Sequence, residues 1–208
     1  MVAPVSEIVW TAQELSIFEI EGFEQRMSQI REKIQPKLRA IGERFSQPLS
    51  RLTSQPCYAH VAKHMRRTVN PPPETWVAFG PSARGYKQFC HYAFVVSAKA
   101  VHLRVVVKSE APNRHELSER LRKEATQLFK ETKDIALRSY WNWNFKESAP
   151  LIGNGEAFWQ EAAAKLALKT GEFDVGIEFS GDSRSVNISE GDLMRAFEQL
   201  SPIHQTLR

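Results

Sequence analysis

The sequence has few cysteines for disulfide cross-links and no long apolar run for a membrane-spanning helix. Its 208 residues include two cysteines, Cys57 and Cys90, too few for a disulfide scaffold. No apolar run approaches the roughly 18 residues that a membrane-spanning helix requires. The first ten residues carry no Lys or Arg and no continuous apolar stretch. We therefore expect no secretory signal, reduced thiols and a cytoplasmic protein without a membrane partner.

Recognised motifs of catalysis are also missing. No G-x-S-x-G elbow occurs, and neither cysteine stands in a recognisable catalytic context. The stretch from Gly80 to Lys87 resembles a phosphate loop, but Tyr86 separates the second glycine from the lysine and Gln88 follows it. We reject that motif and expect Gly85 to form a turn with positive φ. The sequence leaves catalytic residues, cofactor and the question of enzyme activity unassigned.

The overall composition is that of an ordinary globular protein. Hydrophobic residues make up 42% of the chain and charged residues 25%, and 28 basic against 24 acidic residues give a net charge of +4. This excludes collagen-like and wholly disordered chains. The length is sufficient for a core of its own, and no repeat or long linker divides it. We predict a single α+β domain over residues 1–208.

Helical periodicity predicts a long N-terminal helix over residues 22–47. Apolar side chains recur there at steps of three and four: Phe23, Met27, Ile30, Ile34, Leu38, Ile41 and Phe45. We expect Pro36 to kink this helix and Pro48 to end it.

Two to three further helices are expected. One follows Asn113 and Glu116, which have the spacing of a capping box, and ends near Thr132. A second spans residues 154–169 with Gly171 beyond it, and a third opens at Ser189 and stops before Pro202.

Alternating or short apolar runs predict strands near residues 57–62, 75–79, 89–96, 101–109, 135–145 and 172–180. Only four residues separate the third strand from the fourth, which favours an antiparallel hairpin. The predicted fold is therefore a mostly antiparallel sheet of about six strands with helices around it.

A basic stretch contains the candidate site. Residues 44–73 include no Asp or Glu, and residues 60–73 run from a predicted strand into a loop stiffened by three prolines. Arginine, lysine and histidine in such a loop suit an anionic ligand, whereas a solvated basic edge is the plainer interpretation. With the nearby aromatic and basic residues, the candidate ligand-binding set is His60, Lys63, His64, Arg66, Arg67, Asn70, Trp76, Arg84, Tyr86, Lys87 and Glu110.

A metal site at this stretch is not favoured. Cys57, His60 and His64 have C-x2-H-x3-H spacing, but on a strand the cysteine points away from both histidines. We predict no metal ligands. His91 and His102 are expected to be structural histidines with hydrogen-bond partners.

Two other features have competing explanations. Glu110 suits a surface ion pair better than a role as a base or as a group that orients a histidine. Trp141, Trp143 and Phe145 share one face of a predicted strand. They suit a core position better than a platform for stacked bases.

These motifs resemble the YktB-like family of uncharacterised bacterial proteins. The resemblance covers residues 14–130 and is carried by Phe18–Gly22, Arg26–Met27, Ile30–Arg31, His60–Pro72, Thr75–Ala78, Arg84–Lys87 and Glu110–Asn113. It implies a cytoplasmic α+β domain of about this length and no particular reaction. Within the resemblance, residues 60–72 are the best candidate site.

Three functional hypotheses follow. The first is binding of a small anionic ligand, such as a nucleotide or phosphorylated metabolite, by the basic loop. The second, less favoured, is a nucleic-acid-associated module whose basic stretch follows a phosphate backbone. The third is a structural or partner-binding domain without catalysis. The sequence does not indicate an oligomeric state.

Overall fold

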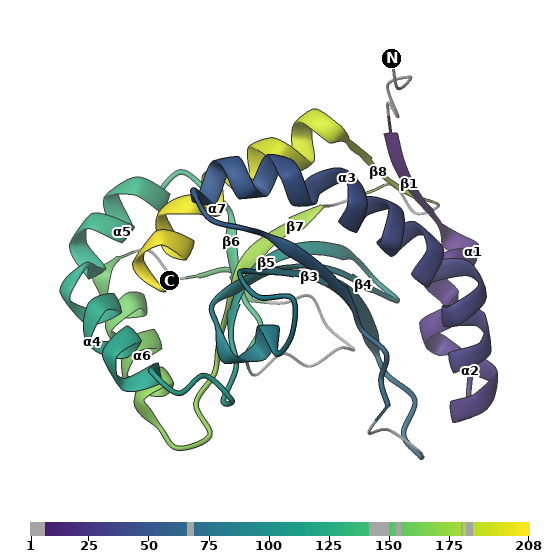
Figure 1. The fold of residues 1–208 in the computed structure, drawn as a ribbon, viewed down its shortest axis with the longest axis horizontal. Helices are drawn as coiled ribbons and strands as arrows, with labels where there is room; N and C mark the ends of the chain where they lie inside the picture. The colour runs from purple at the N-terminus through teal and green to yellow at the C-terminus, as the bar shows by residue number, and fades with distance from the viewer. Residues whose placement is uncertain (1–6, 66–68, 142–149, 153–154, 180, 182–184) are drawn as a thin grey trace.

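The computed structural model describes residues 7–65, 69–141, 150–152, 155–179, 181 and 185–208 (Figure 1). Six strands form one antiparallel sheet in the order β2-β3-β4-β5-β7-β6. They are β2 (Tyr58–Val61), β3 (Glu74–Gly80), β4 (His91–Ser97), β5 (Val101–Val107), β7 (Phe173–Phe179) and β6 (Leu137–Ser139). A separate antiparallel pair joins β1 (Glu7–Thr11) to β8 (Ser185–Ser189). The predicted α+β class is confirmed.

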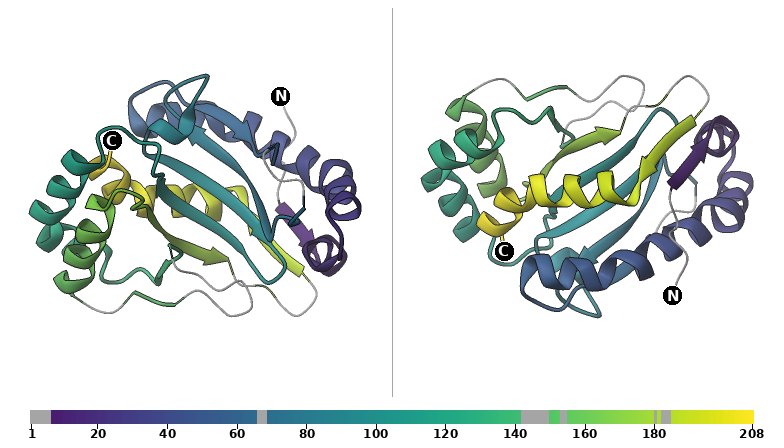
Figure 2. Two further views of the ribbon diagram at one scale, coloured as in Figure 1. Left: turned by 90° about the horizontal axis from the view of Figure 1, so that it is seen from below. Right: turned by 90° about the horizontal axis from the view of Figure 1, so that it is seen from above.

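Helices cover one face of the six-stranded sheet. The described α-helices are α1 (Ala12–Leu15), α2 (Phe23–Gln29), α3 (Gln35–Thr53), α4 (Arg114–Lys123), α5 (Ala125–Thr132), α6 (Glu156–Ala167) and α7 (Glu190–Thr206). Seen from above, α3 and α7 lie across the sheet (Figure 2, right). Seen from below, no described helix crosses the opposite face, and α4, α5 and α6 gather at one end (Figure 2, left). No helix in the described part of the chain is long and apolar enough to span a bilayer.

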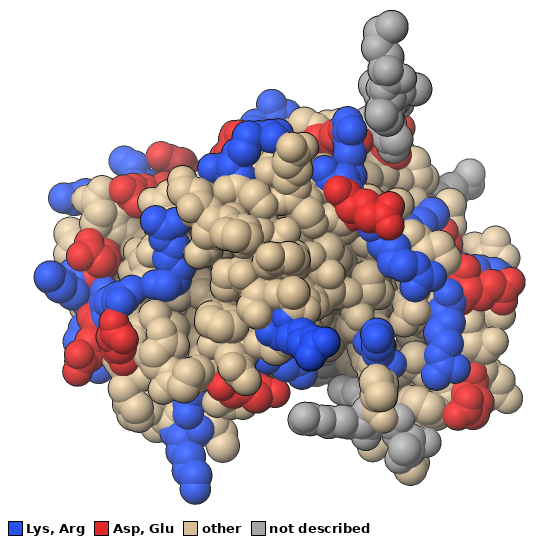
Figure 3. Space-filling view, viewed as in Figure 1, with Lys and Arg blue, Asp and Glu red and all other residues tan. Residues whose placement is uncertain are grey.

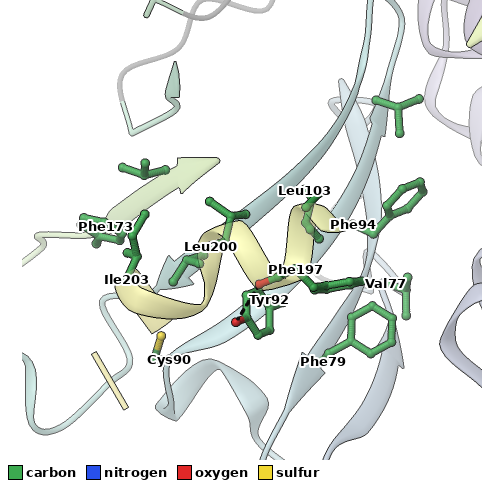
Figure 4. Packing of buried hydrophobic residues seen from close by; sticks show 14 of the residues in the cluster. Val77, Phe79, Cys90, Tyr92, Phe94, Leu103, Phe173, Phe197, Leu200 and Ile203 are labelled. Atoms are coloured by element: carbon green, nitrogen blue, oxygen red, sulfur yellow. Dashed lines mark hydrogen bonds between the residues drawn. The ribbon is translucent and has the colours of Figure 1, made fainter. Parts of the chain in front are cut away.

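Part of the core lies between the sheet and α7. Alternate strand residues point toward this helix, among them Phe79, Tyr92 and Phe173, while α7 contributes Phe197 (Figure 4). The Phe197 ring makes edge-on contacts with Tyr92, at 5.1 Å between centroids, and with Phe79, at 5.7 Å. Such edge-to-face packing adds to the stabilisation from burial.

The opposite face of the sheet carries polar side chains. Cross-strand pairing aligns Ala93 with Arg104, and Arg104 with Gly176. Because partners in register share a face, the small residues flank the guanidinium on both sides. His102 is two residues from Arg104 on β5, and Asp174 is two residues from Gly176 on β7. Because side chains alternate along a strand, both lie on the same face as Arg104.

The same face also carries a small apolar cluster of Ala93, Val95 and Val106, with Trp76 packed against it. The sheet therefore has one apolar face and one face on which charged and apolar side chains are mixed, called the polar face below.

The long N-terminal helix is irregular where a proline was expected to disturb it. Residues Ile30–Ile34 form a π-helical turn, in which the Gln35 N–H bonds to the Ile30 carbonyl. Pro36 follows within the first turn of α3. Since Pro36 cannot donate to the carbonyl four residues back, the hydrogen-bond pattern shifts in the preceding turn.

Two expected helix ends are wrong. The N-terminal helix continues through Pro48 to Thr53, and α7 continues through Pro202 to Thr206. Buried residues beyond each proline, Leu49 and Ile203, pack into the core. That packing outweighs the lost backbone hydrogen bond, as tertiary context commonly does.

Other boundaries also differ from the prediction. Asn113 precedes α4 without a side-chain capping hydrogen bond, and Glu124 separates α4 from α5. By contrast, the Ser189 hydroxyl accepts from the Asp192 N–H at 3.0 Å, as the capping pattern predicted. Strands β1 and β8 were not predicted.

The strand expected over residues 135–145 is limited to Leu137–Ser139 in the described part of the chain. Trp143 and Phe145 lie outside the described residues. Trp141 packs against Phe158 at 5.3 Å and Phe173 at 6.1 Å between ring centroids. This tryptophan therefore packs against the core, as the sequence analysis favoured over a platform for stacked bases.

The contacts of Phe197 predict that it is a main determinant of stability. Phe197→Ala should lower the free energy of unfolding by about 3–5 kcal/mol, because a buried aromatic ring is replaced by a cavity. Urea denaturation measures the change. Leu168→Ala is the control, since Leu168 is 61% exposed and its loss should change stability by less than about 0.5 kcal/mol. Equal effects of the two substitutions would contradict this packing.

A buried histidine on α7 makes stability depend on pH. His204 is 3% exposed and its ring stacks on Tyr92 at 4.4 Å. Burial lowers its pKa to about 3. In the unfolded chain a histidine takes up a proton near a pH of about 6.5, whereas buried His204 stays neutral. The free energy of unfolding therefore decreases as the pH falls below about 6.5, because protonation favours the unfolded state.

His204→Gln should therefore weaken the pH dependence of unfolding. Between pH 7 and pH 5 the wild type should lose about 2 kcal/mol more than the variant, at roughly 1.4 kcal/mol per pH unit below the unfolded pKa. Thermal or urea unfolding at the two pH values measures the difference. Identical losses in both proteins would show that His204 takes up its proton equally in the folded and unfolded states.

Candidate functional site

A groove of about 740 Å³ runs beside the edge strand β2. Its walls come from α3, from β2 and the residues after it, from the 3-10 turn η3 (Tyr86–Gln88), and from the segment after β5. The described lining residues are Gln35, Arg39, Ala59, His60, Val61, Ala62, Lys63, Gly85, Tyr86, Lys87, Gln88 and Glu110.

Five of the predicted site residues line this groove. They are His60, Lys63, Tyr86, Lys87 and Glu110. They come from three segments, each more than twenty residues from the next along the chain: the end of β2, the turn η3 and the segment after β5. The antiparallel strands β2, β3, β4 and β5 bring these segments together. The sequence pattern therefore found residues that share one surface.

Tyr86 is the fixed centre of the groove. Gly85 adopts φ 67°, as expected of a glycine turn, and starts η3. The Tyr86 ring stacks on His60 at 4.9 Å and meets His91 edge-on at 5.0 Å. Its hydroxyl accepts a hydrogen bond from the Trp76 indole N–H at 3.0 Å. Burial raises the pKa of Tyr86, so the hydroxyl is neutral at physiological pH.

The histidine on β2 is held as firmly. His60 Nε2 donates to the Ser82 carbonyl at 2.9 Å, since a carbonyl can only accept. This bond and the stacking on Tyr86 fix the imidazole in the wall of the groove.

Among the charged residues of the described lining, basic side chains predominate. Arg39, Lys63 and Lys87 are cationic, and Glu110 is the one carboxylate in that set. Glu110 lies 3.7 Å from Lys87, with both side chains 42% exposed. This is the surface ion pair predicted for Glu110, and pairs so exposed contribute little to stability.

Four predicted residues do not line the groove. His64 turns toward Thr75, whose hydroxyl lies 2.9 Å from His64 Nε2, and Trp76 lies behind Tyr86. Asn70 and Arg84 are exposed and absent from the described lining. Arg66 and Arg67 lie outside the described residues.

The proline loop after β2 is tied to the first helices. Arg26 donates through Nη1 to the Pro72 carbonyl at 3.0 Å and through Nε to the Ile20 carbonyl at 2.8 Å. One side chain thus joins two of the segments that carry the family resemblance.

The polar face of the sheet contains a charged cluster that the sequence analysis did not predict. Arg104 is 3% exposed, and its Nη2 lies 2.7 Å from the Glu74 carboxylate. Its Nη1 lies 3.4 Å from Asp174 Oδ2, and the guanidinium stacks 3.9 Å from the Tyr140 ring centroid. A buried charge with these partners is held in one position.

Lys108 extends this cluster toward the groove. Its Nζ lies 2.8 Å from Glu172. Burial works to lower the pKa of Lys108, but the carboxylates of Asp174 and Glu172 outweigh it and raise the pKa. Lys108 is therefore charged at physiological pH.

A cavity of about 30 Å³ lies between this cluster and Tyr86. Glu74, Arg104, Lys108 and Asp174 supply its charged wall. Its volume is close to the space that one water occupies in the liquid. Tyr86 and Lys87 line both this cavity and the larger groove.

The two histidines of the hairpin are structural, as predicted. His91 Nδ1 bonds to the Phe89 carbonyl at 2.8 Å, and His102 Nδ1 bonds to the Tyr140 hydroxyl at 2.9 Å. Burial lowers the pKa of His91 to about 4. Neither ring is a cation at neutral pH, because burial also lowers the pKa of His102 well below its ordinary value.

Neither cysteine nor any metal cluster adds chemistry here. Cys57 and Cys90 are free thiols, and burial raises the pKa of Cys57 to about 12. Within the described part of the chain, no three His, Cys, Asp or Glu side chains are grouped to hold a metal ion.

One signal in the sequence pointed to the buried cluster. Arg104 stands in a strand, Val101–Val107, whose other residues are apolar except for His102. A charge within a buried run requires a partner, because arginine is almost never fully buried alone. The partners Glu74 and Asp174 lie 30 and 70 residues away along the chain, so their identity depends on strand order.

Comparison with known proteins places the chain in a family. A family model described as "Domain of unknown function (DUF1054)" matches residues 10–204. A UPF0637 protein of Exiguobacterium sibiricum is 33% identical over 203 residues, which cover 96% of this chain and 98% of that protein. A UPF0637 protein of Bacillus mycoides is 29% identical over 199 residues, 93% of each chain.

Other relatives match over a shorter region. A UPF0637 protein of Staphylococcus carnosus is 43% identical over 111 residues, 53% of this chain and 55% of the relative, so this match spans about half of each protein. The family model and the Exiguobacterium relative each span nearly the whole chain. The protein therefore belongs to the UPF0637 (DUF1054) family of bacterial proteins, as the resemblance in residues 14–130 predicted.

Proposed function

We propose that the protein binds a small anionic ligand, a nucleotide or phosphorylated metabolite, in the groove beside β2. The observation that carries the proposal is the convergence of Arg39, Lys63 and Lys87 from three elements around one groove of about 740 Å³. Ligand sites in proteins commonly occupy about 300–1,000 Å³. Guanidinium and ammonium groups are the usual partners of phosphate.

The rigid wall of the groove supports this assignment. Tyr86 and His60 are stacked on each other, and both are fixed by hydrogen bonds to Trp76 and Ser82. A preorganised wall lowers the entropic cost of binding. The cationic side chains surround this wall, so a phosphate can pair with them without rearrangement of the strand.

Charge distribution favours a small ligand over a nucleic-acid backbone. On the face seen in Figure 3, acidic and basic side chains alternate around the rim, and Lys and Arg form no continuous stripe. Within the groove, Glu110 stands beside Lys87. A protein that follows a phosphate backbone requires a longer run of positive charge.

The proposed setting is the cytoplasm. Both cysteines are free thiols, and thiols persist in reducing compartments. Phosphorylated metabolites and nucleotides are chemically consistent with that setting.

The double substitution Arg39→Ala/Lys63→Ala tests the groove. It should weaken binding of AMP and of ribose 5-phosphate by about 10- to 100-fold for each lost charge contact. Both side chains are exposed, so the fold should be unaffected. Isothermal titration calorimetry measures the affinities, and thermal unfolding checks the fold.

The matched control is Arg122→Ala/Lys130→Ala, which removes one arginine and one lysine from exposed positions on α4 and α5. It should leave the affinities unchanged. No binding of any phosphate compound by the wild type, or equal losses in both double variants, would refute the proposal. Tight binding of a twelve-nucleotide strand that falls about a thousand-fold between about 50 and 200 mM salt would identify a nucleic-acid surface instead.

A further inference from the structure

One buried carboxylate on the polar face has an unused hydrogen-bond acceptor. Asp174 is 7% exposed, and its Oδ1 is buried without a hydrogen-bond partner among the described residues. Its other oxygen, Oδ2, lies 3.4 Å from Arg104 Nη1, which is a long contact. A buried carboxylate oxygen without a donor costs free energy that a bound donor would recover.

The neighbouring cations are engaged by other carboxylates. Arg104 makes its shortest contact with Glu74, at 2.7 Å, and Lys108 pairs with Glu172 at 2.8 Å. Asp174 is thus the third carboxylate beside these two cations, and its contact with Arg104 is longer than those of Glu74 and Glu172. Burial raises the pKa of Asp174 to about 6, although Arg104 and Lys108 act to lower it. At neutral pH the group is ionised and accepts hydrogen bonds.

The cavity that Asp174 lines adjoins the groove. It holds about 30 Å³, enough for one hydroxyl group or one water. Lys87 belongs to both walls. Its 3.7 Å contact with Glu110 is loose and half-exposed, so this side chain can move aside for a ligand.

The charges that line the cavity favour a neutral hydrogen-bond donor to Asp174 over a charged one. Three cations, Arg104, Lys108 and Lys87, line the cavity together with the carboxylates of Glu74 and Asp174. A further ammonium group is disfavoured because the cations already outnumber the carboxylates and like charges repel. A neutral hydroxyl carries a donor without a charge. Buried carboxylates that accept from sugar hydroxyls are a recurring device in nucleotide sites.

We infer that Asp174 Oδ1 is the hydroxyl-binding end of the anion site, so that the ligand class is a hydroxylated phosphate such as a sugar phosphate. The phosphate pairs with Lys87, the groove cation that also lines the cavity, and a neighbouring hydroxyl enters the cavity and donates to Asp174. This inference rests on the proposed anion site and names its substrate class.

Two phosphate esters of equal chain length isolate the hydroxyl contribution. Glycerol 3-phosphate carries hydroxyls that propyl phosphate lacks. The wild type should bind glycerol 3-phosphate at least 10-fold more tightly at pH 7.5, because a hydrogen bond to a buried carboxylate is formed only with that ester. Calorimetric titration of both esters, and of inorganic phosphate, measures the ratio.

Asp174→Asn should reduce this preference to less than about threefold while affinity for inorganic phosphate stays the same. The fold should persist because Glu74 still pairs with Arg104. Asp134→Asn, at an exposed position, is the matched control and should retain the wild-type ratio. The wild-type ratio itself tests the inference even if the Asp174 variant fails to fold.

Each outcome separates the two proposals. Equal affinity of the wild type for both esters, or an unchanged preference in Asp174→Asn, would overturn the hydroxyl assignment while the anion site stands. Failure of all three phosphate compounds to bind would overturn the anion site, and the hydroxyl assignment with it.

Discussion

The two unlike faces of the six-stranded sheet are the constraint on which the rest of the structure depends. One face packs against α3 and α7 and forms the core around Phe197. No described helix covers the other face, and charged side chains pair with one another there. Arg104 does so through Glu74 and Asp174. The groove lies beside the edge strand β2, and the small cavity lies on the polar face over β3, β4, β5 and β7. Tyr86 and Lys87 line both.

Local signals predicted much of this arrangement. The hairpin of β4 and β5 follows from two β-rich runs and a short connection, and Gly85 turns the chain as a glycine with positive φ. Helix ends were less predictable. The helices pass Pro48 and Pro202 because residues beyond each proline are buried, and burial depends on the whole fold.

Contacts between distant segments could not be predicted from the sequence. Strands β1 and β8 lie near opposite ends of the chain and, among the described residues, form a two-stranded sheet of their own. Neither segment therefore carries a local sequence pattern that identifies its partner. Likewise, the basic run predicted His60 and Lys63 in the groove, but Arg39 reaches it from α3. Predicting the Arg104 cluster would have required the strand order, since its partners lie on β3 and β7.

The central claim is that the groove beside β2 is the ligand site of this UPF0637 protein. A two-dimensional amide NMR titration with ribose 5-phosphate tests it most directly, because it reports on every part of the fold at once. The account predicts saturable shifts at the amides of Lys63, Gly85 and Lys87, with those of α4 and α5 unchanged. Shifts confined to the α4–α6 end, or none at saturating ligand, would contradict it.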